Sequence, residues 1–191
     1  ARSRRFASFK SRHAVSVSSF TKIFAPGVRV GWVEGHPSII KRISEYGYIM
    51  SQGGVQPLMG EIMRNVIATN GLDEHLRHLR AEYKRRCDDI CDIIENAGNN
   101  KVQLLLRPTG GYFVWVTFPQ IATQNLFDDW LQNLLNKEGV TILPCHKCDS
   151  IDEAFPGKEN YVSSGRICFA SLTYDETINA VTALCRFAIA N

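Results

Sequence analysis

Apolar and polar residues alternate in two short segments near the start of the chain. Residues 14–18 (Ala-Val-Ser-Val-Ser) alternate, and residues 28–33 (Val-Arg-Val-Gly-Trp-Val) do so again after Pro26-Gly27, with Gly35 closing the second segment. A period of two places successive side chains on opposite faces of a strand. The pattern therefore predicts two strands joined by a polar loop.

Helical spacing follows these strands. Pro37 stands where a first helical turn begins, and four apolar residues then recur at helical spacing, namely Ile39, Ile40, Ile43 and Tyr46. A break at residues 51–54 precedes a second predicted helix over 55–69. Residues 36–72 are therefore expected to form a helical connection.

The longest helical pattern covers residues 73–97. Its apolar stripe recurs at spacings of four and three, through Leu72, Leu76, Leu79, Tyr83, Cys87, Ile90 and Ile94. Asp73 and Glu74 supply favourable charge at its start, and Gly98 is the expected stop. A helix of this length spans about 37 Å at 1.5 Å per residue. This length suits a link between two domains.

The last part of the chain alternates between strand and helix patterns. Strands are predicted over 102–106, 112–118, 140–143 and 166–170, with a loop over 144–162. Thr123 opens one helix, which ends at Gly139, and Thr173 with Glu176 forms a capping box for the final helix. The chain is therefore expected to be a mixed α/β protein with a compact α+β unit after the long helix.

Composition and charge exclude several classes of protein. The chain has 191 residues, 45% hydrophobic and 21% charged, which are globular proportions. No window approaches 18 uninterrupted apolar residues, so we expect no membrane span. The net charge is +3, but residues 1–12 hold five basic residues and no acid. The remainder has 17 basic and 19 acidic residues. We therefore expect no nucleic-acid partner.

The Arg- and Ser-rich start of the chain, residues 1–12, has the composition of a mitochondrial transit peptide. A solvated end of the chain is the alternative. The expected location is the cytoplasm, with the mitochondrion as the second candidate.

The cysteines and histidines suggest neither a disulfide framework nor a metal site. Six cysteines occur in a chain rich in core residues, which favours a reducing compartment. Cys145 and Cys148 have metal-knuckle spacing, but no second ligand pair of suitable spacing accompanies them. His75 and His78 share one face of the long helix, which neighbouring charges indicate is solvated. We expect no metal.

Candidate chemistry is concentrated in residues 19–32, with the sequence Ser-Phe-Thr-Lys-Ile-Phe-Ala-Pro-Gly-Val-Arg-Val-Gly-Trp. Ser19, Thr21, Lys22 and Arg29 bring two hydroxyls, an amine and a guanidinium between two predicted strands. Hydroxyl donors and a guanidinium suit a phosphate monoester, because charge-assisted bonds fix its position and orientation. A lysine beside such an anion can hold an aldehyde carbon as a Schiff base.

This segment resembles the lysine motif of the class I and II (fold-type I) pyridoxal-phosphate aminotransferases, in the form associated with aminoadipate and kynurenine aminotransferases. Two later stretches resemble the same family in the expected order. Residues 108–115 (Pro-Thr-Gly-Gly-Tyr-Phe-Val-Trp) are similar to its Gly-Gly-aromatic strand, and residues 165–171 (Gly-Arg-Ile-Cys-Phe-Ala-Ser) to its carboxylate-binding strand. The resemblance covers nearly the whole chain. It favours an interior run leading to the lysine strand, rather than a transit peptide, for residues 1–12.

The resemblance implies a role for each matching residue. Lys22 matches the Schiff-base lysine, and Ser19, Thr21 and Arg29 match the positions that bind the phosphate of pyridoxal 5'-phosphate. Arg166 matches the arginine that binds the substrate α-carboxylate. The implied fold is a remnant of the large-domain sheet plus a C-terminal α+β small domain. Residues 1–35 would end the large cofactor-binding domain, and 73–191 would comprise the interdomain helix and the small domain.

The implied activity is transfer of an amino group from an amino acid to a 2-oxo acid. The family's residues that bind the cofactor ring lie upstream of the matching region, so this stretch is expected to be inactive alone. Its expected partners are the two substrates, the missing N-terminal half and a second copy in a homo-oligomer. The alternative is a non-catalytic aminotransferase-like domain, used for binding or oligomerisation or as the sensor half of a transcription regulator.

Overall fold

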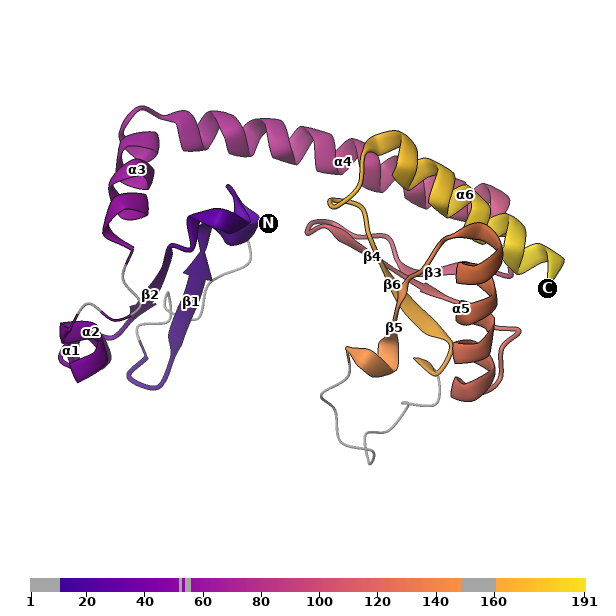
Figure 1. The fold of residues 1–191 in the computed structure, drawn as a ribbon, viewed down its shortest axis with the longest axis horizontal. Coiled ribbons are helices and arrows are strands. Elements are labelled where there is room, and N and C mark those ends of the chain that lie inside the picture. Colours follow the sequence, from indigo (N-terminus) through magenta and orange to yellow (C-terminus); the bar gives the residue numbers. More distant parts are fainter. Residues whose placement is uncertain (1–10, 52, 54–55, 149–160) are drawn as a thin grey trace. The chain divides into compact units, whose positions relative to one another are not determined.

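The computed structural model describes residues 11–51, 53, 56–148 and 161–191 (Figure 1). The chain divides into two compact units, residues 1–79 and 80–191, and the division falls inside one long helix. Most of the predicted basic tail, and residues 149–160 of the predicted loop, lie outside the described residues. The predicted three-part division at 35/36 and 72/73 stays a prediction.

The first unit begins with an antiparallel hairpin of β1 (Val15–Ser19) and β2 (Gly31–Gly35). Two short 3-10 turns connect the strands, η2 (Phe20–Lys22) and η3 (Pro26–Val28). Both predicted strands are confirmed, but β2 begins three residues later than predicted. Arg29 is the reason, because its φ of 50° is left-handed and cannot continue a strand.

Four helices follow: α1 (Pro37–Ser44), α2 (Gly47–Met50), α3 (Pro57–Ala68) and α4 (Gly71–Ala97). Prolines occupy the first position of α1 and α3, where the missing N–H costs nothing. The predicted apolar stripe through Tyr46 is interrupted, because the backbone of Tyr46 is extended and the short α2 starts afresh at Gly47. No helix in the described ranges is both long and apolar enough to cross a membrane.

The first unit has a small core and many exposed apolar side chains. Phe20, Val28 and Met63 are its fully buried hydrophobic residues among those described. On the hairpin the predicted alternation is present, but the valines face outward, since Val17 is 76% exposed and Val15 40%, while Ser16 and Ser18 are half-buried. Strands that belong in a larger sheet are expected to expose apolar side chains in this way when the rest of the sheet is absent.

The second unit is built on a four-stranded antiparallel sheet of order β3-β4-β6-β5. Its strands are β3 (Gln103–Leu106), β4 (Phe113–Thr117), β5 (Leu143–Pro144) and β6 (Ser164–Cys168), and its helices are α5 (Gln124–Glu138), α6 (Tyr174–Ala190) and the later part of α4. Three boundaries correct the predictions. The strand expected at 140–143 is only two residues long, and Cys145–Lys147, expected as loop, form the 3-10 turn η4. The strand expected at 166–170 lies two residues earlier, at Ser164–Cys168.

The helices of this unit cover one face of the sheet. Val114, Val116 and Ile167 point to that face and are buried against α4, α5 and α6. The aromatic ring of Phe118 lies 4.7 Å from Trp130 and 5.4 Å from Phe127, centroid to centroid. The caps are as predicted: Gly139 ends α5 with a φ of 66°, and Thr173 with Glu176 forms the capping box of α6. The mixed α/β fold is therefore confirmed.

Candidate functional site

The loop that contains Lys22 is tied together at its base by backbone hydrogen bonds. The Phe20 N–H donates to the carbonyl oxygen of Val30 over 2.9 Å, which continues the hairpin one step beyond the strands. The Phe24 N–H donates to the carbonyl oxygen of Phe20 over 2.8 Å. The turn η2 therefore starts directly at the end of β1, and these hydrogen bonds fix the backbone position of Lys22.

A buried aromatic residue anchors the same turn. Phe20 is 8% exposed and its ring centroid lies 4.9 Å from that of Trp32. Val28 and Met63 complete the small core beneath it. Because Phe20 points inward, the residues that follow it turn outward: Thr21 is half-buried and Lys22 is exposed.

The other two predicted phosphate residues lie on the same loop. Ser19 is the last residue of β1 and lies opposite Gly31, and Arg29 is two residues before Gly31. A Cβ at position 31 would come within 2.8 Å of the Ser18 carbonyl oxygen, so only glycine allows this close approach. The structure thus brings Ser19, Thr21, Lys22 and Arg29 together in one short loop.

The electrostatics of this loop are one-sided. Lys22 and Arg29 are exposed cations, and no Asp or Glu occurs before Glu34 in the sequence. Within the described ranges, neither side chain forms an ion pair or a hydrogen bond. A loop with two uncompensated cations and two hydroxyls can accept an anion rich in oxygen atoms.

Arg166 belongs to the second unit, where the uncovered face of the sheet presents it. It lies on β6 opposite Trp115 of β4, and on its other side opposite Leu143 of β5. Its guanidinium carbon is 3.9 Å from the centroid of the Phe113 ring. Stacking on an aromatic face orients the planar guanidinium and leaves its N–H groups available at the edge. Arg166 and Lys22 lie in different units.

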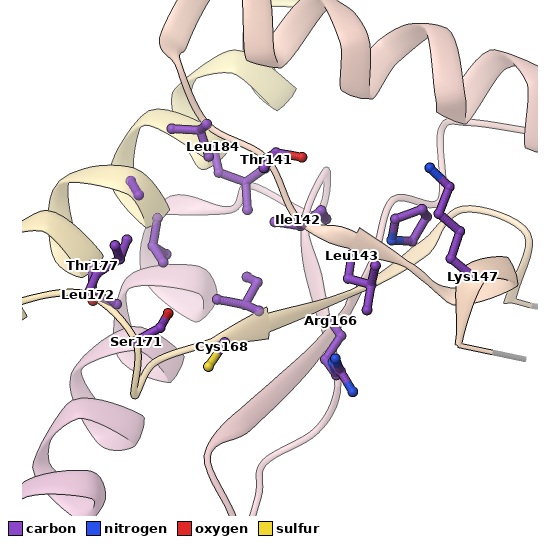
Figure 2. A pocket seen from close by; sticks show the side chains of 15 residues that line it. Thr141, Ile142, Leu143, Lys147, Arg166, Cys168, Ser171, Leu172, Thr177 and Leu184 are labelled. Carbon is purple, nitrogen blue, oxygen red and sulfur yellow. The ribbon is translucent and has the colours of Figure 1, made fainter. Parts of the chain in front are cut away.

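A hollow of about 380 Å³ lies beside Arg166, and the sequence did not suggest it (Figure 2). Ile142 and Leu143 line it from the β5 edge, Cys168 and Leu172 from the end of β6 and the turn after it, and Leu184 from α6. Its walls are mainly apolar, and Lys147 and Arg166 are its charged lining residues.

The glycine pair singled out from the sequence forms the turn between β3 and β4. Gly111 has a φ of 87°, in the left-handed region, and a Cβ at either Gly110 or Gly111 would meet no atom within 4 Å among the described residues. The backbone conformation at Gly111 therefore requires glycine. The space around both residues is open.

Among the described residues, no group of three His, Cys, Asp or Glu side chains could hold a metal ion. His78 is exposed, as predicted, but His75 is half-buried and packs edge-on against Phe24, with the ring centroids 5.3 Å apart. The prediction of a solvated face was therefore wrong for His75. The cause is Phe24, which the loop brings onto that side of α4.

One cluster near the candidate site was missed by the sequence analysis. Arg86 of α4 donates from Nη1 to the carbonyl oxygens of Phe169 (3.1 Å) and Leu172 (2.8 Å), in the turn that follows β6. Its Nε donates to Glu82 over 2.7 Å. The bonds from Arg85 and Arg86 lower the pKa of Glu82 to about 2. The available signal was an acid and a base four residues apart beside the apolar stripe.

Comparison with known proteins identifies the family. Residues 3–184 match the model of the family described as aminotransferase class I and II. The HTH-type transcriptional regulator NorG of Staphylococcus aureus is 29% identical over 153 residues, which are 76% of this chain and 33% of NorG. The chain thus spans about a third of the length of this relative.

Two solved structures share the fold. The α-aminoadipate aminotransferase LysN of Thermus thermophilus, complexed with N-(5'-phosphopyridoxyl)-L-leucine, superimposes with a TM-score of 0.67 at 20% identity, over 92% of this chain and 42% of LysN. The kynurenine aminotransferase of Pyrococcus horikoshii gives 0.70 at 24% identity, over 92% and 40% of the two chains. With its fold, its lysine loop and a family match over almost its whole length, this chain belongs to the class I and II aminotransferases.

Proposed function

We propose that this chain is the C-terminal part of a pyridoxal-phosphate-dependent aminotransferase. It would move an amino group from an amino acid to a 2-oxo acid. The observation that supports this most directly is the lysine loop, where Lys22 follows a buried anchor and shares a short segment with Ser19, Thr21 and Arg29. The family match and the related solved aminotransferases favour the same activity.

The loop suits the phosphate end of the cofactor. A phosphate monoester is a dianion with several acceptor oxygens, and this loop offers two hydroxyl donors and a guanidinium without a nearby acid in sequence. Gly31 also lets the two strands close tightly below Arg29. In this proposal Ser19, Thr21 and Arg29 hold the phosphate, and Lys22 lies next to the aldehyde carbon.

The reaction needs a proton acceptor and an orienting group. Pyridoxal phosphate, when bound, supplies a ring that withdraws electrons from the substrate Cα. Lys22 Nζ, in its uncharged form, would take the proton from the substrate Cα and deliver it to the C4′ atom of the cofactor. The Arg166 guanidinium would bind the α-carboxylate through two parallel hydrogen bonds and so fix the direction of the Cα–H bond.

The proposal includes a requirement for more chain. The family's ring-binding residues lie upstream of the region matched here, so we propose that this segment needs that half for amino transfer. We also propose a homo-oligomer, because the first unit exposes eleven large apolar side chains among those described. A cytoplasmic location suits the six cysteines, none of which forms a disulfide.

An absorbance titration with pyridoxal phosphate, followed by borohydride reduction and peptide mapping, tests the lysine. Lys22→Ala is the test variant, and Lys41→Ala is the control, because Lys41 is an exposed lysine of the same unit, 3.7 Å from Glu45. Label confined to Lys22, lost in Lys22→Ala and kept in Lys41→Ala, is the expected result. Equal labelling of several lysines in all three proteins would overturn the assignment of Lys22 in this chain.

A second candidate is the sensor half of a transcription regulator. The similarity to NorG over 153 residues is the specific observation that favours it. The coding sequence upstream of this chain distinguishes the two candidates. A helix-turn-helix segment there would favour the regulator, and the missing part of an aminotransferase large domain alone would favour the enzyme.

A further inference from the structure

The turn between β6 and α6 is held in place by α4. One nitrogen of the Arg86 guanidinium, Nη1, donates to two carbonyl oxygens of this turn, those of Phe169 and Leu172. These acceptors lie three residues apart, so a single side chain closes the turn. The contact joins residues 83 and 86 positions apart in the sequence.

Arg86 is itself fixed. Its side chain is 16% exposed, and its Nε donates to Glu82 one helical turn earlier. Glu82 also accepts from Arg85, and these bonds hold its pKa well below the ordinary value. A guanidinium with carboxylate on one edge and carbonyl oxygens on the other has little freedom to move.

A second contact ties the other end of the turn to the same face of α4. Tyr174, the first residue of α6, lies under the Arg85 guanidinium, with 3.9 Å between Arg85 Cζ and the ring centroid. The Tyr174 hydroxyl donates to Asp89 over 2.8 Å. Glu82, Arg85, Arg86 and Asp89 follow helical spacing, so one face of α4 holds both ends of the turn.

The turn is directly connected to Arg166. Strand β6 ends at Cys168, two residues after Arg166, and the next residue, Phe169, is 1% exposed. The Phe169 N–H donates to the carbonyl oxygen of Tyr112 over 3.2 Å. Tyr112 precedes Phe113, whose ring lies under the Arg166 guanidinium. The turn therefore adjoins the last pair of the β4–β6 ladder, Phe113 with Cys168, beside the point where Arg166 meets Phe113.

We propose that Arg86 is a positioning residue for Arg166: by holding the Phe169 and Leu172 carbonyls, it fixes the end of β6 and keeps the Arg166 guanidinium over the Phe113 ring. The importance of this position for binding a substrate carboxylate rests on the proposed function. The positioning itself involves only residues of the second unit. It is therefore testable without cofactor or substrate.

The test measures Arg166 by NMR in the full chain, labelled with ¹³C,¹⁵N-arginine. The Arg166 Hδ protons should be shifted upfield by the Phe113 ring, and Phe113→Leu identifies that shift. In Arg86→Ala we expect more than half of it to be lost. Arg107→Ala is the matched control. Like Arg86, Arg107 donates to carboxylates of α4, in its case Asp92 and Glu95, but it has no bond to the turn between β6 and α6.

Arg86→Lys guards against a variant that does not fold. Lysine keeps the charge beside Glu82, but a single ammonium cannot reproduce the two-sided bonding of the guanidinium. We therefore expect Arg86→Lys to lose less of the Arg166 Hδ shift than Arg86→Ala does. An unchanged Arg166 shift in the folded Arg86 variants would overturn the proposal, and so would an equal loss in Arg107→Ala. Failure of Lys22 labelling would overturn the proposed function and leave this result unaffected.

Discussion

Ser19 and Gly31 lie directly opposite each other where the β1–β2 hairpin opens into the lysine loop. A Cβ on residue 31 would lie 2.8 Å from the Ser18 carbonyl oxygen and 3.4 Å from the Ser19 Cβ. Gly31→Ala must therefore separate the strands at the base of the loop. We expect it to lower the free energy of unfolding by about 1–3 kcal/mol and to reduce pyridoxal-phosphate labelling of Lys22.

Gly27→Ala is the control for this prediction. Gly27 lies in the same loop, but a Cβ there would meet no atom within 4 Å among the described residues. We expect its unfolding free energy and its labelling to stay close to those of the wild-type chain. Thermal unfolding and peptide mapping measure both quantities. Equal behaviour of the two alanine variants would contradict the close-approach argument.

The cysteines of the second unit should differ strongly in reactivity. Burial raises the pKa of the Cys91 thiol to about 12 and that of Cys185 to about 11. Both side chains are about 1% exposed or less, whereas Cys148 is half-buried at the end of η4. Because the thiolate is the reactive form, we expect N-ethylmaleimide at pH 7 to modify Cys148 well before Cys91 or Cys185.

Mass spectrometry of a time course locates the modified residues. Addition of denaturant should bring Cys91 and Cys185 to the rate of Cys148, since burial is the main cause of their protection. Early modification of Cys91 in the native chain would mean that the core around α4 opens more easily than its packing indicates.

Local chemistry explains which parts of the structure the sequence predicts well. Thr173 and Glu176 cap α6 through bonds between residues three apart, and Gly139 ends α5 through its own φ angle. Neither feature depends on distant parts of the chain. The same holds for Ser19, Thr21, Lys22 and Arg29, which a single loop groups together, although their predicted roles remain to be tested.

Pairing over long distances explains what the sequence did not predict. The two-residue length of β5 depends on its register with β6, and Arg86 finds its acceptors 83 and 86 residues away. The outward valines of β1 are also invisible to a periodicity argument, because alternation does not say which face is covered.

The ion pairs of Glu82 should make stability depend on pH in the acid range. Its pKa is about 2 in the folded chain against an ordinary 4.5, because Arg85 and Arg86 donate to its carboxylate. A depressed pKa stabilises the folded state above about pH 4.5, and this contribution is lost as the pH falls towards 2. We expect Glu82→Gln to be less stable than wild type at pH 7, with the difference shrinking through that window.

Thermal unfolding at several pH values measures this difference. Glu45→Gln is the control, because the pair of Glu45 with Lys41 is exposed and should contribute little at any pH. A Glu82→Gln difference that stays constant between pH 7 and 3 would show that the carboxylate charge does not stabilise this face of α4.

Arg29 allows function and stability to be separated. Its φ of 50° and ψ of 32° are left-handed, which costs a non-glycine residue about 1–2 kcal/mol. Glycine adopts this conformation freely, so Arg29→Gly should keep or raise the thermal stability of the chain while removing the guanidinium from the loop. In the proposed function it should also weaken the binding of pyridoxal phosphate and of inorganic phosphate.

Asn70→Gly is the control for Arg29→Gly. At a φ of 59° between α3 and α4, it relaxes the same kind of backbone and should leave phosphate binding unchanged. Phosphate affinity that is equal in the two glycine variants would show that Arg29 binds no phosphate, whereas a loss of stability in Arg29→Gly alone would show that its side chain has a structural role.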